Sequence, residues 1–304
     1  MVLVYGAAGL LGQMICRRLR QEGKRVRALF ARPASAASLE SLNQLGVEVF
    51  FADLRECAAV AAACNGVDSV ICADSAMMPC RNEPPLDSAR VRCLVEFASA
   101  LGVERFVFVT VPDRFAAPCA LMSARDEGRA RLEAHSMDYV LIQTGLFMDT
   151  WLTPEFGFDV KAGKATVFGD GTQPIAWVSC EDVADFAVRS LHVDHRSDHR
   201  FHVAAPENLS PFDLIRVFED IRGDRMEVTR IPEPELRAEH RAAADPGDRV
   251  IAAMKLQYAY GLPLRANHHD MPVKLSSVRD FASRAIAAPR LVNRASASPF
   301  VESD

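Results

Sequence analysis

Short apolar runs alternate with amphipathic segments through the first half of the chain. The runs have the length of buried strands, and the segments between them repeat their apolar residues at helical spacing. Such alternation builds right-handed crossovers, and it predicts an α/β fold with a doubly wound parallel sheet. The expected strands are Val2–Tyr5, Val26–Phe30, Val47–Phe50, Ser69–Ala73, Phe106–Thr110 and Tyr139–Ile142, and the expected helices are Leu11–Gln21, Ala36–Leu45, Cys57–Cys64, Ser88–Leu101 and Leu121–Ser136.

The alternation of apolar runs and amphipathic segments becomes less regular after Gly145. Four glycines punctuate Phe156–Pro174, which is typical of turns and a hairpin or loop. Phe201–Ala204 has the pattern of a late strand, and Pro211–Ile221 that of a helix with proline in its first turn. We therefore expect a nucleotide-binding domain over residues 1–145 and a smaller, mostly helical substrate lobe over 146–288. The lobe would be interleaved with the sheet near 175–205, and residues 289–304 would form a flexible tail.

Composition narrows the class of protein. The chain has 304 residues, 49% of them hydrophobic, and a net charge of -5 without a basic stripe or a long apolar run. Neither nucleic-acid binding nor a membrane span is expected. The first strand begins at Val2, which leaves no room for a signal peptide. Eight cysteines include no C-x-x-C pair, so we expect reduced thiols and a cytoplasmic protein.

The histidines suggest no metal site. Four of them fall within residues 192–202, a stretch that has the pattern of an exposed connection between a helix and a strand. We expect no bound metal there.

The chain opens with a glycine-rich turn between a strand and a helix. Gly6 permits a tight turn, Gly9 lets the backbone approach a pyrophosphate, and Gly12 lets the helix pack closely on the strand. The helix N-terminus offers unpaired N–H groups to phosphate. The candidate cofactor contacts in this turn are Gly6, Ala8, Gly9, Leu10, Leu11 and Gly12.

The ends of the next strands indicate which dinucleotide is bound. Arg32 stands after the second strand, where an acidic residue would select NAD and a guanidinium would match a 2′-phosphate. The pattern favours NADP(H), although Arg32 could also be an ordinary exposed loop arginine. Asp53, followed by Leu54, is placed to meet an adenine or to cap the next helix. Ala73 and Asp74, at the end of the fourth strand, complete the expected cofactor contacts.

Taken together, these features resemble the NmrA-like branch of the atypical short-chain dehydrogenase/reductase family. The resemblance covers roughly residues 1–220 and implies a Rossmann-type sheet, NADP(H) binding, and either reductase or redox-sensing function. It rests on Gly6–Gly12, Arg32, Asp53-Leu54, Phe106–Thr110, Leu141–Met148, Lys161–Ala165, Phe168–Gly171, Ile175–Val178 and Asp182–Ala184.

The chain departs from that family in its acid–base residues. None of the four tyrosines is followed four residues later by lysine, and no lysine occurs between Lys24 and Lys161. Arg125 stands where many relatives carry a lysine, and Gln143-Thr144 replaces an arginine-proline pair. Arginine can bind ribose hydroxyls or an oxyanion, but it does not release a proton near neutral pH. Arg125 and Thr110 are thus the candidates for both cofactor contact and catalysis.

Two functional hypotheses follow. The chain is either a reductase of a quinone, an enone or another activated carbonyl, or a catalytically silent NADP(H) sensor that acts on a protein partner. A small hydrophobic substrate would meet Ser75, Phe147, Met148 and Trp151, although such an apolar group is also typical of an ordinary core. We expect a monomer or a homodimer.

Overall fold

The structure, a computed structural model, describes residues 1–30, 36–52, 56–73, 88–192, 200–267, 271 and 273–288. Its largest element is a seven-stranded parallel sheet with the strand order β11-β6-β5-β4-β1-β2-β3. The strands are β1 (Val2–Tyr5), β2 (Val26–Phe30), β3 (Glu48–Phe51), β4 (Ser69–Cys72), β5 (Arg105–Thr110), β6 (Asp138–Thr144) and β11 (Arg200–Val203). The predicted α/β class is confirmed, and the late strand predicted at Phe201–Ala204 is the edge strand β11.

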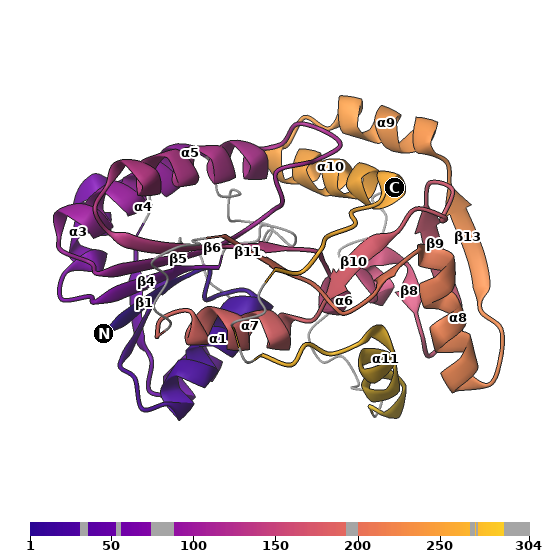
Figure 1. The fold of residues 1–304 in the computed structure, drawn as a ribbon, viewed down its shortest axis with the longest axis horizontal. Coiled ribbons are helices and arrows are strands. Elements are labelled where there is room, and N and C mark those ends of the chain that lie inside the picture. The colour runs from indigo at the N-terminus through magenta and orange to yellow at the C-terminus, as the bar shows by residue number, and fades with distance from the viewer. Residues whose placement is uncertain are drawn as a thin grey trace, which may run out of the picture.

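Helices cover both faces of this sheet (Figure 1). One face packs against α1 (Leu10–Gln21), α2 (Ala36–Gln44) and α7 (Cys180–Arg189). The other packs against α3 (Cys57–Cys64), α4 (Ser88–Ala100) and α5 (Ala120–Ala134). The central strands are apolar at successive positions because both of their faces are buried.

The strand order reverses between β1 and β4. From β1 the chain moves outward to β2 and β3, then returns to β4 and continues to β5 and β6. Helices that follow the two halves therefore leave a crevice at the carboxyl ends of β1 and β4, which is where open α/β sheets bind ligands.

The C-terminal part of the chain forms a lobe at the carboxyl end of the sheet (Figure 1). It contains two three-stranded sheets, β12-β10-β7 and β13-β9-β8, with helices around them. Besides its helices the lobe contains paired strands that are distant in sequence: β13 pairs with β9, although β10, α7, β11, β12 and α8 lie between them. Its elements are β7 (Leu146–Phe147), α6 (Met148–Trp151), a 3-10 turn (Pro154–Phe156), β8 (Phe158–Asp159), β9 (Lys164–Phe168), β10 (Ile175–Val178), β12 (Asn208–Leu209), α8 (Pro211–Arg222), β13 (Glu227–Ile231), α9 (Glu233–Ala242), α10 (Pro246–Tyr260) and α11 (Val278–Ala287).

Two of these elements follow the sequence signals closely. The stretch Phe156–Pro174 contains the antiparallel pair β8 and β9, as a hairpin pattern predicts. Helix α8 begins after Ser210, whose hydroxyl accepts a hydrogen bond from the Asp213 N–H, with Pro211 in the first turn.

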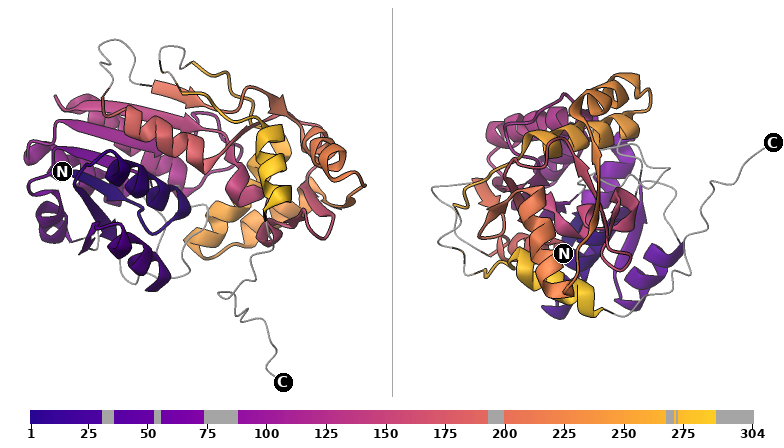
Figure 2. Two further views of the ribbon diagram at one scale, coloured as in Figure 1. Left: turned by 90° about the horizontal axis from the view of Figure 1, so that it is seen from below. Right: turned by 90° about the vertical axis from the view of Figure 1, so that its right-hand side faces the viewer.

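The sheet and the lobe share segments of chain. After β10 in the lobe, α7 returns to pack beside α1 and β11 joins the edge of the large sheet (Figure 2). Met271 and Leu275 then lie in the core of the large sheet, whereas Val278 of α11 lies in the core of the lobe. The chain therefore crosses between the two parts several times.

Within the described residues, no helix combines the length and the apolar character that a bilayer crossing requires. Cys16, Cys64, Cys72, Cys93, Cys119 and Cys180 are free thiols, and all of them except Cys93 are buried.

Candidate functional site

The glycine turn before α1 has the geometry that close backbone packing requires. Gly6 has a φ of 84°, and the Gly9 N–H donates to its carbonyl at 3.1 Å. A Cβ on Gly12 would lie 2.2 Å from the Gly6 oxygen and 2.6 Å from the Ala7 Cα. Only glycine fits at position 12, because α1 starts in direct contact with the end of β1.

The N-terminus of α1 is open to a ligand. Gly9 is its N-cap without a capping side chain, and the first turn contains no acidic residue. Among the described residues, a Cβ on Gly9 would meet only the Gly6 oxygen, at 3.5 Å, so they leave space in front of the helix. Leu10 is exposed and Leu11 is buried, so Leu11 could meet a cofactor only through its backbone.

The carbonyl of Ala8 is held by side chains from two helices. Gln13 Nε2 donates to it at 3.0 Å, and Ser38 Oγ of α2 donates at 3.3 Å. These bonds hold the Ala8 carbonyl in place and do not use the backbone N–H groups of the turn.

Part of the expected cofactor site lies outside the described residues. This applies to Arg32, Asp53, Leu54 and Asp74, and also to Ser75 of the expected substrate pocket. Ala73 is described: it is buried at the end of β4, and its N–H donates to the Tyr5 carbonyl at 2.9 Å. Ala73 thus lies beside the glycine turn, and the choice between the two dinucleotides stays a prediction.

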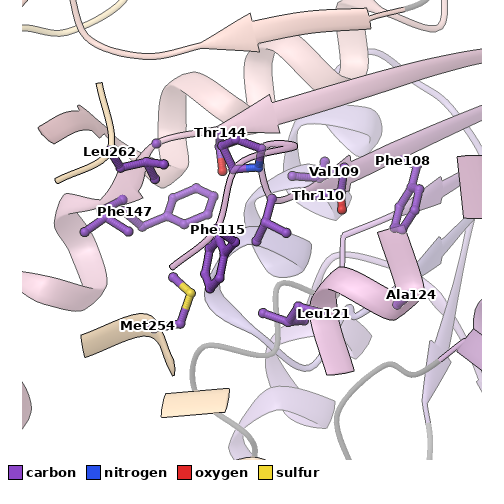
Figure 3. Close-up of a pocket in the computed structure, with 14 residues that line it drawn as sticks. Phe108, Val109, Thr110, Phe115, Leu121, Ala124, Thr144, Phe147, Met254 and Leu262 are labelled. Carbon is purple, nitrogen blue, oxygen red and sulfur yellow. The ribbon is translucent and has the colours of Figure 1, made fainter. Parts of the chain in front are cut away.

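An apolar cavity lies at the carboxyl ends of β5 and β6 (Figure 3). Phe115, Phe147, Met254 and Leu262 gather on one side of it in the close-up, and Thr110 lies across from them. Its volume is about 30 Å³, far less than a ring system occupies. The complete lining is Phe108–Pro112, Phe115, Leu121, Ala124, Thr144–Phe147, Met254 and Leu262.

The three apolar residues expected in a substrate pocket separate in the structure. Phe147 lines the cavity, but Met148 and Trp151 are buried in the core of the lobe and are not among its lining residues. The Trp151 ring packs 4.8 Å from Phe156 and 5.3 Å from Tyr258, centroid to centroid. Two of the three therefore lie where an ordinary core residue would.

Arg125 is buried and engaged by the loop that follows β5. Its Nη1 donates to the Pro112 carbonyl, its Nε donates to Asp126 Oδ1 at 3.0 Å, and its Nη2 lies 2.9 Å from the same oxygen. Arg125 is not among the residues that line the cavity, whereas Thr110 is. In this arrangement the Arg125 guanidinium holds the Pro112 carbonyl and the Asp126 carboxylate.

A wider cleft adjoins the cavity. It has a volume of about 670 Å³ and shares Pro112, Phe115 and Leu262 with the cavity as a common wall. The rest of its lining was not anticipated from sequence and consists of Asp113, Arg114, Ala116, His202, Arg237, Gln257, Tyr260, Gly261, Pro263 and Leu264.

A hydrogen-bonded chain links two lining residues of this cleft, His202 and Asp113, through Gln143. His202 Nε2 lies 2.9 Å from Gln143 Oε1, and Gln143 Nε2 donates to Asp113 Oδ1 at 3.0 Å. Burial works against the ionised form of Asp113, but the bond from Gln143 and three guanidinium groups outweigh it, so the pKa of Asp113 is lowered. Gln143 replaces the family's arginine, and that departure was the one sequence signal for this cluster.

The tyrosines of the lobe are poor proton donors. Burial raises the pKa of Tyr258, and burial together with the Glu233 carboxylate raises that of Tyr260. The Tyr260 hydroxyl donates to Glu233 and accepts from Arg237. Of the described residues that line the cavity, Thr110 and Thr144 are the ones with side-chain hydroxyls.

No metal centre is found in the described ranges: nowhere there do three His, Cys, Asp or Glu side chains come together in a way that would hold a metal ion.

Comparison with known proteins agrees with the interpretation of the glycine turn as part of a nucleotide-binding site. A family model described as NAD(P)H-binding matches residues 6–194. The NAD(P)H azoreductase of Xenophilus azovorans is 27% identical over 215 residues, which cover 69% of this chain and 70% of the relative. The photosystem II assembly factor Ycf39 of Cyanophora paradoxa is 24% identical over 242 residues, covering 76% of this chain and 71% of the relative.

The fold is also similar to solved structures. The triphenylmethane reductase of Citrobacter sp., in complex with NADP(H), superposes with a TM-score of 0.73 at 14% identity, covering 93% of this chain and 99% of the other. At that identity the likeness concerns the fold.

Proposed function

The chain belongs to the NAD(P)H-binding family, and on that premise we propose that it is an NADPH-dependent reductase which transfers a hydride to a small, activated acceptor. The observation that carries the proposal is the glycine turn, in which only glycine fits at position 12 and the start of α1 is uncapped. A helix N-terminus of this kind favours a bound diphosphate. Arg32 is proposed to select the 2′-phosphate of NADP(H).

The residues at the strand ends suggest which acceptors suit the protein. When bound, the reduced nicotinamide supplies the hydride. Thr110 and Thr144, at the carboxyl ends of β5 and β6, would lie beside the ring outside the cavity, and the apolar wall around Phe147 would exclude water. Since the described residues that line the cavity include no histidine, lysine or carboxylic acid, an acceptor that is reduced at the mouth of the cavity should form a stabilised anion. A quinone, an enone or another activated carbonyl meets that requirement, because solvent can then protonate the product.

The names of two relatives point in the same direction. One is called an azoreductase and another a triphenylmethane reductase, and both names denote reduction of conjugated acceptors. We therefore propose a small, mostly apolar conjugated acceptor for this chain. Separately, we propose that the protein is cytoplasmic and acts as a monomer or homodimer.

A second function is favoured by Arg125. Its guanidinium is engaged by Pro112 and Asp126 and does not line the cavity. A relative is named as an assembly factor. Together these observations support a catalytically silent NADP(H)-binding protein that acts on a protein partner.

Two measurements separate the functions. NADPH oxidation is followed with a panel of quinones, enones and azo compounds, and NADPH binding is measured by calorimetry. Steady turnover with any acceptor supports the reductase. Micromolar binding of NADPH without turnover supports the silent protein, and absence of binding of either nicotinamide nucleotide contradicts both.

A further inference from the structure

The volumes of the two hollows indicate where an acceptor would lie. Ligand sites commonly occupy about 300–1,000 Å³. The apolar cavity has about 30 Å³ and the adjoining cleft about 670 Å³. Of the two, only the cleft has room for a conjugated molecule, and its wall of Pro112, Phe115 and Leu262 is also a wall of the cavity.

The charges around the cleft are mainly positive. Asp113 is the one carboxylate in the lining, and Arg200 Nη1 lies 2.9 Å and Arg129 Nη1 3.3 Å from its oxygens. Arg237 in the lining is paired with Glu233. The described residues of this cluster include five guanidinium groups and three carboxylates, although the whole chain has a net charge of -5. They are Arg114, Arg125, Arg129, Arg200 and Arg237, with Asp113, Asp126 and Glu233.

Arg114 differs from the other arginines of this cluster. It is exposed, it lines the cleft, and it makes no hydrogen bond or ion pair with the described part of the chain. It follows Asp113 and precedes Phe115, so its backbone lies beside the apolar wall and its side chain borders the cleft. A cation at that place can meet an anionic group whose apolar part rests on Phe115.

We propose that the cleft binds conjugated acceptors that carry an anionic group, with Arg114 as the residue that selects the anion. This inference rests on the proposed function, because it names the substrate class of the same site. The apolar ring lies against Phe115 and Leu262, toward the cavity, and the anion lies at the open side near Arg114. Arg237 and Tyr260 border the same cleft from α9 and α10.

The test uses a matched pair of acceptors: a naphthoquinone with a propionate side chain and its methyl ester. The two share the reacting ring and differ by one charge. We expect kcat/KM for the acid to exceed that for the ester by about three- to tenfold at low salt, and this ratio to fall to one or below in Arg114→Glu. Arg25→Glu is the control, because Arg25 is exposed at the opposite end of the sheet and should leave the ratio unchanged.

A binding measurement keeps this inference separate from the proposed function. The Kd of 3-(2-naphthyl)propionate and of its amide is measured by calorimetry with the wild type, Arg114→Ala and Arg114→Glu. If no quinone is reduced but the acid still binds more tightly than the amide, and only while Arg114 is present, the reductase fails and the anion site stands. If quinones are reduced with the same acid-to-ester ratio in wild type and Arg114→Glu, the reductase stands and the anion site is overturned.

Discussion

Gly9 and Gly12 lie three residues apart in the turn before α1, and a Cβ on each would meet different surroundings. At position 12 it would meet the Gly6 and Ala7 backbone, which cannot move without separating α1 from β1. We expect Gly12→Ala to lower the free energy of unfolding by about 1–3 kcal/mol, as overpacking does in well-packed cores. Urea denaturation measures this change.

Gly9→Ala is the matched variant, because its Cβ points into free space and its φ of -77° suits alanine. Its stability should stay within about 0.5 kcal/mol of the wild type. A methyl in front of the helix N-terminus should nevertheless weaken NADPH binding at least tenfold. Unchanged NADPH affinity in Gly9→Ala would argue that the pyrophosphate does not approach this turn.

Arg32 lies outside the described residues, so its role is tested through cofactor preference. If its guanidinium binds the 2′-phosphate, Arg32→Ala should weaken NADPH binding far more than NADH binding, because only NADPH carries that group. Calorimetry with both nucleotides provides the measurement. Equal losses for the two would leave Arg32 without the phosphate role.

Arg125 tests whether a residue positions the site or acts on the reacting atoms. Arg125→Met leaves the Pro112 carbonyl and Asp126 without their partner, so we expect a loss of about 1–3 kcal/mol in unfolding free energy with a small change in NADPH affinity. Arg125→Lys should recover part of that stability, since lysine can still donate to the carbonyl. Full stability of Arg125→Met together with lost turnover would instead place Arg125 in the chemistry.

At the scale of elements, Asp149 of α6 connects the lobe to the start of α7. Its carboxylate accepts a hydrogen bond from the Cys180 N–H at 2.7 Å. We expect Asp149→Ala to lower the unfolding free energy by about 1–2 kcal/mol, because a buried N–H at a helix start loses its acceptor. Asp149→Asn should retain most of the stability, since its amide oxygen can accept the same bond.

The difference in stability between wild type and Asp149→Asn should depend on pH. Burial raises the pKa of Asp149 in the folded protein, against smaller lowering effects that include the Cys180 bond. Its contribution to stability is thus complete below its unfolded pKa of about 3.9 and is lost as pH rises through the folded value. Wild type should therefore lose stability relative to Asp149→Asn as the pH rises from about 4 through the raised folded pKa. A constant difference in that range would contradict the raised pKa.

The elements that sequence predicted well are those whose signal is local. Strands β1 and β5 are continuous apolar runs, and the turn around Gly6 is specified by the residues within it. Strand β13 was missed because its residues are mostly exposed, and it exists through its pairing with β9, about sixty residues earlier in the chain.

The same physical limit applies to the site. Thr110 was placed correctly at the end of its strand because strand ends can be read locally. The cleft combines a loop after β5 with His202 of β11, Arg237 of α9 and Tyr260 of α10. Their meeting depends on how the lobe packs, which no local pattern specifies. Met148 and Trp151 were expected near a substrate because the sequence does not show that they pack in the core of the lobe.

At the scale of the whole molecule, the chain crosses several times between sheet and lobe, so we expect that neither part unfolds alone. Helix α7 covers α1, and β11 adds the edge strand, although both follow lobe strands in sequence. Residues 1–145 without them would leave the α1 face of the sheet partly bare. The segment after Leu262 leads from the lobe back to the large sheet, where Asn267 binds the backbone of β11. Its Oδ1 accepts a hydrogen bond from the His202 N–H at 2.6 Å, and its Nδ2 donates to the Arg200 carbonyl at 3.0 Å.

The two tryptophans of the chain, Trp151 and Trp177, are both buried in the core of the lobe, whereas the glycine turn lies in the large sheet. Tryptophan fluorescence therefore follows the lobe, and far-UV circular dichroism follows the whole molecule. If the shared segments make one cooperative unit, the two signals should give the same urea midpoint. NADPH at a hundred times its Kd should raise the unfolding free energy by about 2.7 kcal/mol. Both urea midpoints should then shift to higher urea concentration. A fluorescence transition that comes first and ignores NADPH would instead show that the lobe unfolds independently, and that the crossings of α7 and β11 do not couple it to the cofactor site.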